Sequence, residues 1–324
     1  MVLPGRRSRE ASSAARRGPR TPRPTAVPAL TDGRDPYPGC MALHRITGSL
    51  EDLVAPVFVA AFDGWIDAAG AATGCANQLG QGGDTVVSFD ADALTDYRSR
   101  RPVLDVIDGV LNDVAWPELA IRRRRAGERD LLVVVGPEPD FRWRELGEDM
   151  AELALQLGVV EWVTLGAIPA AVPHTRATNV FATASRPELL HHDVEQGPQG
   201  LLRVPSAALS AVELAVMSAG VACVGFYAQV PHYVGGPFAS GSIALLEHVE
   251  RHLGVEVGLG SLPEDALAQR QRLDVAVEGD ESTRAYVTQL EAGLEEQRIP
   301  SGDELAGEIE RFLRDTEGGE TGGR

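Results

Sequence analysis

The sequence predicts an α/β fold in which a mostly parallel sheet is covered by helices on both faces and followed by a C-terminal helical appendage. Three observations support this fold class. From Leu53 onward, segments with strand character alternate with segments of helical periodicity. The first strand candidate, Val54–Phe62, is a nearly continuous apolar run, as a strand buried on both faces requires. After Gly260 only helical patterns follow.

The expected elements succeed one another without long gaps. Strands are expected at Val54–Phe62, Thr85–Phe89, Val103–Asp108, Leu119–Arg124, Leu131–Val135, Val159–Leu165, Ala177–Ala182 and Val221–Val230. Helices are expected at Asp67–Leu79, Trp143–Leu157, Ala207–Ala219 and Ile243–Leu253. The helix from Trp143 is the best defined, because apolar residues recur on one face at helical spacing. Asp140 is its expected N-cap, and Ser-x-x-Glu patterns at Ser261 and Ser301 are typical of capping boxes in the tail.

The first 40 residues are expected to be a disordered extension. They hold eight arginines against three acidic residues and few large apolar side chains, so they cannot bury enough surface to fold. Met41 suggests an over-extended start of translation; the other interpretation is a genuine basic arm. The expected layout is then an α/β domain at 41–260, a helical tail at 261–316 and a disordered end at 317–324.

Composition restricts the chemistry and the compartment. All 30 basic residues are arginine, which excludes a P-loop lysine, a Schiff base and a lysine general base. The three cysteines, Cys40, Cys75 and Cys223, show no C-x-x-C spacing, which favours a reducing compartment. No apolar run approaches the roughly 20 residues that a membrane helix needs. We therefore expect a cytoplasmic protein without a membrane partner.

Charge is distributed unevenly along the chain. The net charge is −17, of which the first 40 residues contribute +5, so the remainder carries −22. An acidic body of this kind repels a phosphate backbone, and no nucleic-acid partner is expected. The exception is the run Arg122–Arg125, which is interpreted as a solvated strand end before a turn at Gly127.

The segment Asp63–Gly70 lies where the first strand gives way to a helix. In open α/β sheets, ligands bind at the carboxyl ends of strands, close to helix N-termini. Asp63 and Asp67 could serve there in acid–base chemistry or ligand binding. The alternative is that Asp67 caps the helix while the glycines allow a tight turn.

Two Pro-His dipeptides follow later strands. Pro173–Arg176 comes after the strand at 159–165, and Pro231–Tyr233 follows the strand at 221–230. Because parallel strand ends share one edge of a sheet, His174 or His232 could act as a general base beside Asp63. The alternative is that each histidine is hydrogen-bonded within its loop for structural reasons.

Further charged loops complete the set of candidate motifs. Tyr97–Pro102 is rich in arginine and Gly136–Asp140 in acids, so these loops could pair with each other or with a partner. His191, His192 and Asp193 lack a further spaced ligand, so no metal site is expected. No cofactor is expected either.

Together these motifs resemble the proteasome assembly chaperone 2 family, in its bacterial high-GC, actinobacterial-type branch. The matching segments are Gly64-Trp65-x-Asp67-Ala68, Tyr97–Pro102, Gly136–Asp140, Pro173–Arg176 and Gln229–Tyr233. The resemblance implies a three-layer α/β/α fold like that of nucleoside phosphorylases. It also implies a homo-oligomer, for which a trimer is the first expectation.

The same resemblance implies partners. Eukaryotic members help to assemble proteasome α-rings, and archaeal relatives bind the core particle, so proteasome subunits are the expected partners here. Docking tails in such relatives end in a hydrophobic residue, tyrosine and any residue. This chain ends Glu320–Arg324 without that pattern, so insertion of the tail into a proteasome pocket is not expected.

The leading hypothesis is a non-catalytic protein-binding or assembly factor. The alternative is a hydrolase, a phosphorylase or the carboxylate–amine ligase that some bacterial members are labelled as, with Asp63, His174 and His232 as catalytic groups. For either function, the working face is expected at the strand ends. Its candidate residues are Asp63, Gly64, Trp65, Asp67, Arg98, Arg101, Pro173, His174, Thr175, Arg176, Pro231, His232 and Tyr233.

Overall fold

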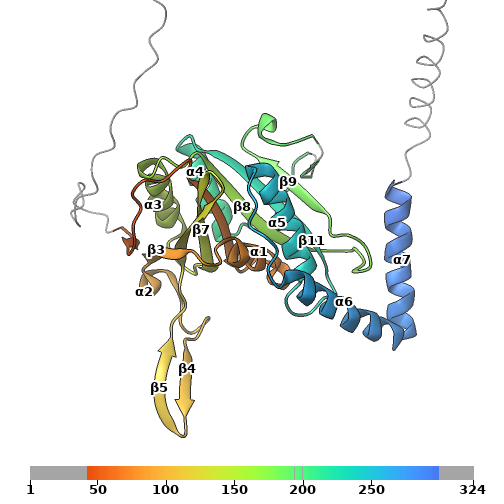
Figure 1. The fold of residues 1–324 in the computed structure, drawn as a ribbon. Coiled ribbons are helices and arrows are strands. Elements are labelled where there is room, and N and C mark those ends of the chain that lie inside the picture. Colours follow the sequence, from red (N-terminus) through yellow and green to blue (C-terminus); the bar gives the residue numbers. More distant parts are fainter. Residues whose placement is uncertain (1–41, 193, 199, 299–324) are drawn as a thin grey trace, which may run out of the picture. The chain divides into compact units, whose positions relative to one another are not determined.

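The computed structural model describes residues 42–192, 194–198 and 200–298 (Figure 1). The predicted extension at 1–40, the Ser301 pattern and the predicted end at 317–324 lie outside these ranges. The strands are β1 (His44–Ile46), β2 (Val57–Asp63), β3 (Asp84–Phe89), β4 (Val103–Ile107), β5 (Val110–Ala115), β6 (Ala120–Ala126), β7 (Arg129–Pro137), β8 (Glu161–Ala170), β9 (Val180–Ala184), β10 (Glu195–Gln196) and β11 (Ala222–Pro231). The helices are α1 (Ala71–Leu79), α2 (Ala91–Leu94), α3 (Trp143–Gln156), α4 (Ala208–Ser218), α5 (Ala239–Leu253), α6 (Leu262–Glu278) and α7 (Glu281–Arg298), with short 3₁₀ turns at Ala68–Gly70 and Pro187–Leu189.

Nine of these strands form one mixed sheet in the order β1-β3-β6-β7-β2-β8-β11-β9-β10. Its four central strands, β7, β2, β8 and β11, run parallel. Antiparallel pairs flank them, among them β6 with β7, which are joined through the tight turn at Gly127, where φ is +57°. This arrangement confirms the predicted α/β class with a parallel sheet centre and C-terminal helices.

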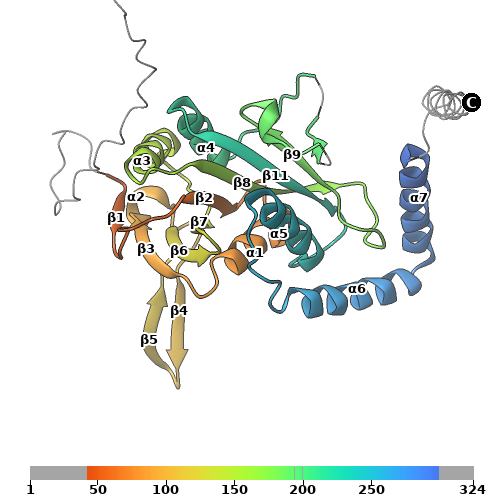
Figure 2. The same ribbon diagram turned by 45° about the horizontal axis from the view of Figure 1, so that its top comes forward.

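Side chains alternate across the central strands, and each face of the sheet has its own helices. In β2, Val57, Val59 and Ala61 belong to a core shared with α1 and α5. Phe58 and Phe62 point to the opposite core, which α3 and α4 cover. The two helical layers are visible on either side of the sheet in Figure 2. Every second residue thus enters a different core, which explains why the strand is apolar throughout.

One predicted helix cap is wrong, and a second has the predicted N-cap residue but lacks the hydrogen bond of a capping box. Asp140 does not cap α3, whose N-cap is Arg142, in the left-handed conformation (φ +59°). The Asp140 carboxylate instead accepts a hydrogen bond from the Asp96 backbone N–H at 2.8 Å, which ties two loops together. Ser261 is the N-cap of α6 but makes no capping hydrogen bond, because its hydroxyl donates to the side chain of Asp265.

The predicted strand at Val103–Asp108 does not join the main sheet. Its residues form β4, which pairs only with β5 in a separate two-stranded hairpin that extends away from the main sheet (Figure 1). The hairpin turn is Asp108-Gly109, with φ of +50° and +79°. Two successive positive φ angles define the turn type that suits the twist of a two-residue hairpin.

The arginine run Arg122–Arg125 lies in β6 and is more ordered than a solvated strand end. Strand alternation sends Arg123 and Arg125 to one face, where both bind the buried carboxylate of Asp130. Arg124 points to the other face and donates to the carbonyls of Gln78 and Leu79 at the end of α1. The run therefore joins elements on both faces of the sheet.

The C-terminal helices pack on the body through polar contacts more than through a core. In α6, Gln269 is buried and donates to the Pro237 carbonyl, and in α7 the buried apolar residue is Val287. Among the described helices, none combines the length and the apolar character needed to cross a bilayer.

Candidate functional site

The predicted strand-end residues fall into two clusters. The first surrounds Asp63 at the carboxyl end of β2. The guanidinium of Arg100 donates to the Asp63 carboxylate at 2.6 Å and to its backbone carbonyl at 2.9 Å. Both residues line a cavity of about 580 Å³ at the base of the hairpin, together with Arg101. The Tyr97–Pro102 segment, which was expected to pair with the acidic loop Gly136–Asp140 or with a partner, thus contacts Asp63 through Arg100.

Glu138 fixes the loop that follows β2. Its carboxylate accepts hydrogen bonds from the backbone N–H groups of Trp65 at 2.8 Å and Ala208 at 2.7 Å. A Cβ atom on Gly64 would lie 2.1 Å from the same carboxylate, so glycine is required at that position. The Trp65 side chain remains 63% exposed and free for contact with a partner.

Asp67 caps α1. One carboxylate oxygen accepts from the backbone N–H groups of Ala72 at 2.8 Å and Thr73 at 3.2 Å, and the other accepts from the Thr73 hydroxyl at 2.5 Å. Burial raises the pKa of Asp67, although these hydrogen bonds act in the opposite direction. With three donors on its carboxylate, Asp67 is placed for helix capping, the second of the two roles considered for it.

The second cluster contains His174 and Tyr233. The hydroxyl oxygen of Tyr233 accepts from the His174 backbone N–H at 2.8 Å and lies 2.7 Å from His174 Nδ1. His174 Nε2 lies 3.2 Å from the Asp274 carboxylate of α6, and Arg270 of the same helix donates to the His174 carbonyl. This histidine is only 6% exposed, and burial lowers its pKa. We refer to His174, Tyr233, Arg270 and Asp274 as the α6 latch.

Helix α7 contacts the neighbouring residues of the same loops. The Thr175 hydroxyl donates to Glu291 and the Arg176 guanidinium donates to Glu295. The ring of His232 packs edge-on against Tyr286 of α7 with centroids 5.7 Å apart. Much of the polar capacity of these loops is thus engaged by the chain's own C-terminal helices.

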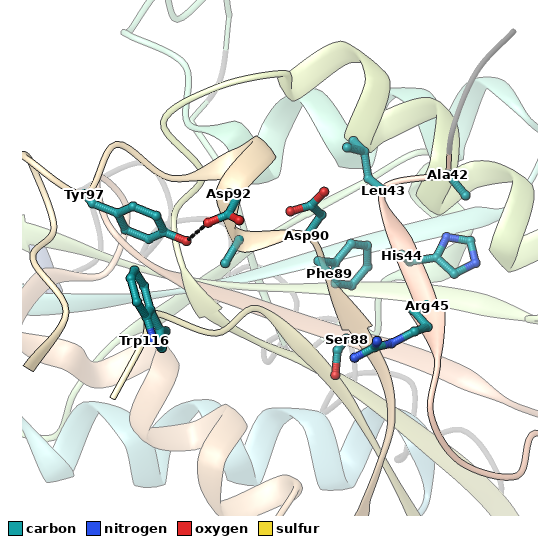
Figure 3. A pocket seen from close by; sticks show the side chains of 11 residues that line it. Ala42, Leu43, His44, Arg45, Ser88, Phe89, Asp90, Asp92, Tyr97 and Trp116 are labelled. Atoms are coloured by element: carbon teal, nitrogen blue, oxygen red, sulfur yellow. Dashed lines mark hydrogen bonds between the residues drawn. The ribbon is translucent and has the colours of Figure 1, made fainter. Parts of the chain in front are cut away.

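A second cavity, of about 590 Å³, is lined by residues of β1, the end of β3 and α2, and by Tyr97 and Trp116 (Figure 3). In it, the Tyr97 hydroxyl donates to the Asp92 carboxylate at 2.7 Å, and this hydrogen bond raises the pKa of Tyr97 to about 12. The Tyr97 and Trp116 rings meet edge-on with centroids 4.9 Å apart. Trp116 immediately follows β5, so this pair attaches the hairpin to the body.

The three residues of the enzyme hypothesis are not brought into one cavity. His174 and His232 both contact the Tyr233 ring. Asp63 instead lines the cavity with Arg100 and Arg101, whose lining includes neither histidine. Within the described residues, no group of three or more His, Cys, Asp or Glu side chains is placed to hold a metal ion.

Several residues that organise the clusters were not among the predicted site residues. Arg100 lies in the Tyr97–Pro102 segment but is not one of the candidate residues of the working face. Asp274 of α6, which contacts His174, lies 100 residues further along the chain. The hairpin strand β5 was also missed. Its signal was present, because Asp108-Gly109 flanked by apolar runs is a strong indication of a hairpin.

The fold and the strand-end loops define a three-layer α/β/α protein whose C-terminal helices pack on those loops. The sequence model of the PAC2 family matches residues 61–277. The chain belongs to the PAC2 family, which confirms the resemblance found in its motifs. No curated protein matches the sequence.

Solved actinobacterial structures share this fold along most of their length. A proteasome-assembly chaperone homologue of Mycobacterium tuberculosis is 34% identical, with a TM-score of 0.64, and the match covers 71% of this chain and 99% of the homologue. A PAC2 family protein of Streptomyces avermitilis is 33% identical, with a TM-score of 0.62 and coverage of 72% and 99%. A Mycobacterium tuberculosis protein of unknown function is 30% identical, with a TM-score of 0.73 and coverage of 81% and 94%.

Proposed function

We propose that this protein is a non-catalytic, cytoplasmic assembly factor that self-associates and binds proteasome subunits. The observation that carries the proposal is the exposed apolar hairpin β4–β5. Similarity to the proteasome-assembly chaperone homologue of Mycobacterium tuberculosis supports proteasome subunits as the partner. The separation of Asp63 from the two histidines, and the hydrogen bonds that His174 makes within the α6 latch, favour this function over a hydrolase, phosphorylase or ligase.

The hairpin presents apolar side chains on both of its faces. Val106 and Leu111 lie opposite each other on one face, and Ile107 and Val110 do so on the other. All four are more than half exposed, and Leu111 reaches 71%. An isolated two-stranded hairpin is only marginally stable in water, and contiguous apolar surface of this kind marks a binding site. Burial on another protein surface would therefore stabilise the hairpin.

The charges of the hairpin indicate a second copy of this chain as the occupant. Asp105 and Asp113 lie directly opposite each other, and like charges in that position are destabilising. Arg98, at the base of the hairpin, is exposed and has no acidic partner among residues 42–192, 194–198 and 200–298. The arginine of one copy can lie between the two aspartates of the next. Head-to-tail contacts form a ring when the rotation between copies closes, and we expect a closed trimer.

The test is binding to purified proteasome α and β subunits from the native host, followed by size-exclusion chromatography with light scattering. The proposal predicts a complex that contains α subunits. The double variant Val106→Asp with Leu111→Asp should lose it, because two charges in the contact between copies would prevent the self-association on which the complex is proposed to depend. The matched control is Val275→Asp, which changes an exposed valine of α6 outside the hairpin and should keep the complex.

Two results would contradict the proposal. If neither subunit binds the wild-type protein, the proteasome is not its partner. If the hairpin variant and the control bind equally well, binding of the proteasome does not depend on self-association through the hairpin.

A further inference from the structure

The cavity of about 580 Å³ beside Asp63 has a charged and aromatic lining, which protein binding by the hairpin does not require. It opens at the carboxyl ends of the neighbouring parallel strands β2 and β7, where open α/β sheets bind small ligands. Three arginines line it, Arg100, Arg101 and Arg122, against the acidic residues Asp63 and Glu118. A net positive cavity stands out in a body that carries −22.

The three arginines differ in how they are paired. Arg100 is engaged by Asp63, but Arg101 and Arg122 have no carboxylate partner in the described part of the chain. Arg122 is half-buried, and its neighbour on the same face of β6, Arg124, donates instead to carbonyls at the end of α1. A half-buried guanidinium without a counter-ion is costly, because charge is poorly solvated there. An anion between Arg101 and Arg122 would remove that cost.

The remaining walls of the cavity are apolar or neutral. Trp116, which is 58% exposed, lines the cavity together with Val103, Pro117 and Pro137. An indole offers a flat face on which a planar ring can stack. The side chain of Asn77, also in the lining, adds hydrogen-bonding groups. These walls suit a ligand with a planar apolar body more than a bare inorganic ion.

We propose that this cavity binds a small organic anion, in which a carboxylate or phosphate group is held by Arg101 and Arg122 and a planar ring rests on Trp116. Guanidinium groups bind both kinds of anion through paired hydrogen bonds. The site is separate from the apolar faces of the hairpin tip, so it adds a small-molecule ligand to the proposed assembly function.

The test is isothermal titration of the full chain with phenyl phosphate, which carries both the anionic group and the ring. Binding should be saturable and tighter than that of inorganic phosphate, which lacks the ring, and of phenol, which lacks the charge. A parallel titration with benzoate distinguishes a carboxylate from a phosphate as the preferred group. Arg122→Ala should weaken phenyl phosphate binding by about tenfold or more, because a charge-assisted contact is lost.

The matched control is Arg129→Ala. Arg129 is also half-buried and lies on the adjacent strand β7, but it does not line the cavity. Its variant should bind like the wild type. Should Arg122→Ala fail to fold, Arg101→Ala provides the same test at an exposed position.

Three outcomes would overturn the proposal. The first is no saturable binding of phenyl phosphate or benzoate up to about 10 mM, a limit that corresponds to negligible affinity. The second is equal weakening by the Arg122 and Arg129 variants. The third is unchanged binding by Arg122→Ala together with a loss of oligomer mass, which would assign the arginine to contacts between copies of the chain.

Discussion

At the scale of single residues, the Asp67 carboxylate has a structural role that can be measured. It accepts three hydrogen bonds, all from the first turn of α1. Asp67→Ala should lower the free energy of unfolding by about 1–2 kcal/mol, the usual cost of losing the side-chain hydrogen bonds that cap a helix. The measurement is urea denaturation, with Asp84→Ala, at an exposed position in β3, as the control. A loss of partner binding with unchanged stability would assign Asp67 to function instead.

His174 should make stability depend on pH. Because burial lowers its pKa below the usual 6.5, the folded protein resists protonation that the unfolded chain accepts. Stability should therefore fall as the pH drops below about 6.5, where the unfolded chain binds the additional proton. Protonation at Nδ1 would also prevent that nitrogen from accepting the hydroxyl hydrogen of Tyr233.

The measurement is the melting temperature of wild type and His174→Gln between about pH 8 and about pH 5. The variant cannot titrate at this position, so its profile should be flatter than that of the wild type. The comparison subtracts the other histidines, which both proteins share. Arg270, Asp274, Tyr233 and Glu291 surround His174 and keep their identities in both. Parallel profiles would show that the α6 latch does not sense pH.

At the scale of elements, periodicity allowed accurate prediction where one face of an element is buried in a single core. The predicted helix at Trp143–Leu157 agrees with α3 to one residue, because its apolar face packs on the sheet and on α4. The run Val54–Phe62 became β2 (Val57–Asp63) for a different reason, because both faces of this strand are buried, each in its own core. The hairpin was only half predicted, because exposed apolar residues give strands β4 and β5 no core-facing pattern.

The position of the candidate loops at the strand ends could be predicted from the sequence, but the contacts between their side chains could not. Strand order placed Asp63 and the loops after β8 and β11 at the carboxyl ends of parallel strands. Which side chain meets which depends on tertiary contacts between distant segments. Arg176 meets Glu295, which is 119 residues further along the chain, and local sequence carries no signal of such a contact. From the sequence alone, His174 could therefore still be a general base, whereas the structure places it against α6.

At the scale of the whole molecule, we propose that this protein works as an assembly of its own copies built through the hairpin. The reason is energetic. The hairpin exposes apolar side chains on both faces and opposes Asp105 to Asp113, so the isolated chain leaves a costly surface in water. Assembly would bury the apolar side chains and offset the repulsion between the two aspartates. It would also bring several copies of the proposed proteasome-binding surface together.

The most direct test is the mass of the purified protein in solution, measured by light scattering across micromolar concentrations. We expect a closed oligomer, with a trimer as the expected size, for the wild type and for Val275→Asp. The double variant Val106→Asp with Leu111→Asp should be a monomer with an unchanged melting temperature. A wild-type monomer, or an oligomer that survives in the hairpin variant, would show that the protein does not assemble through the hairpin.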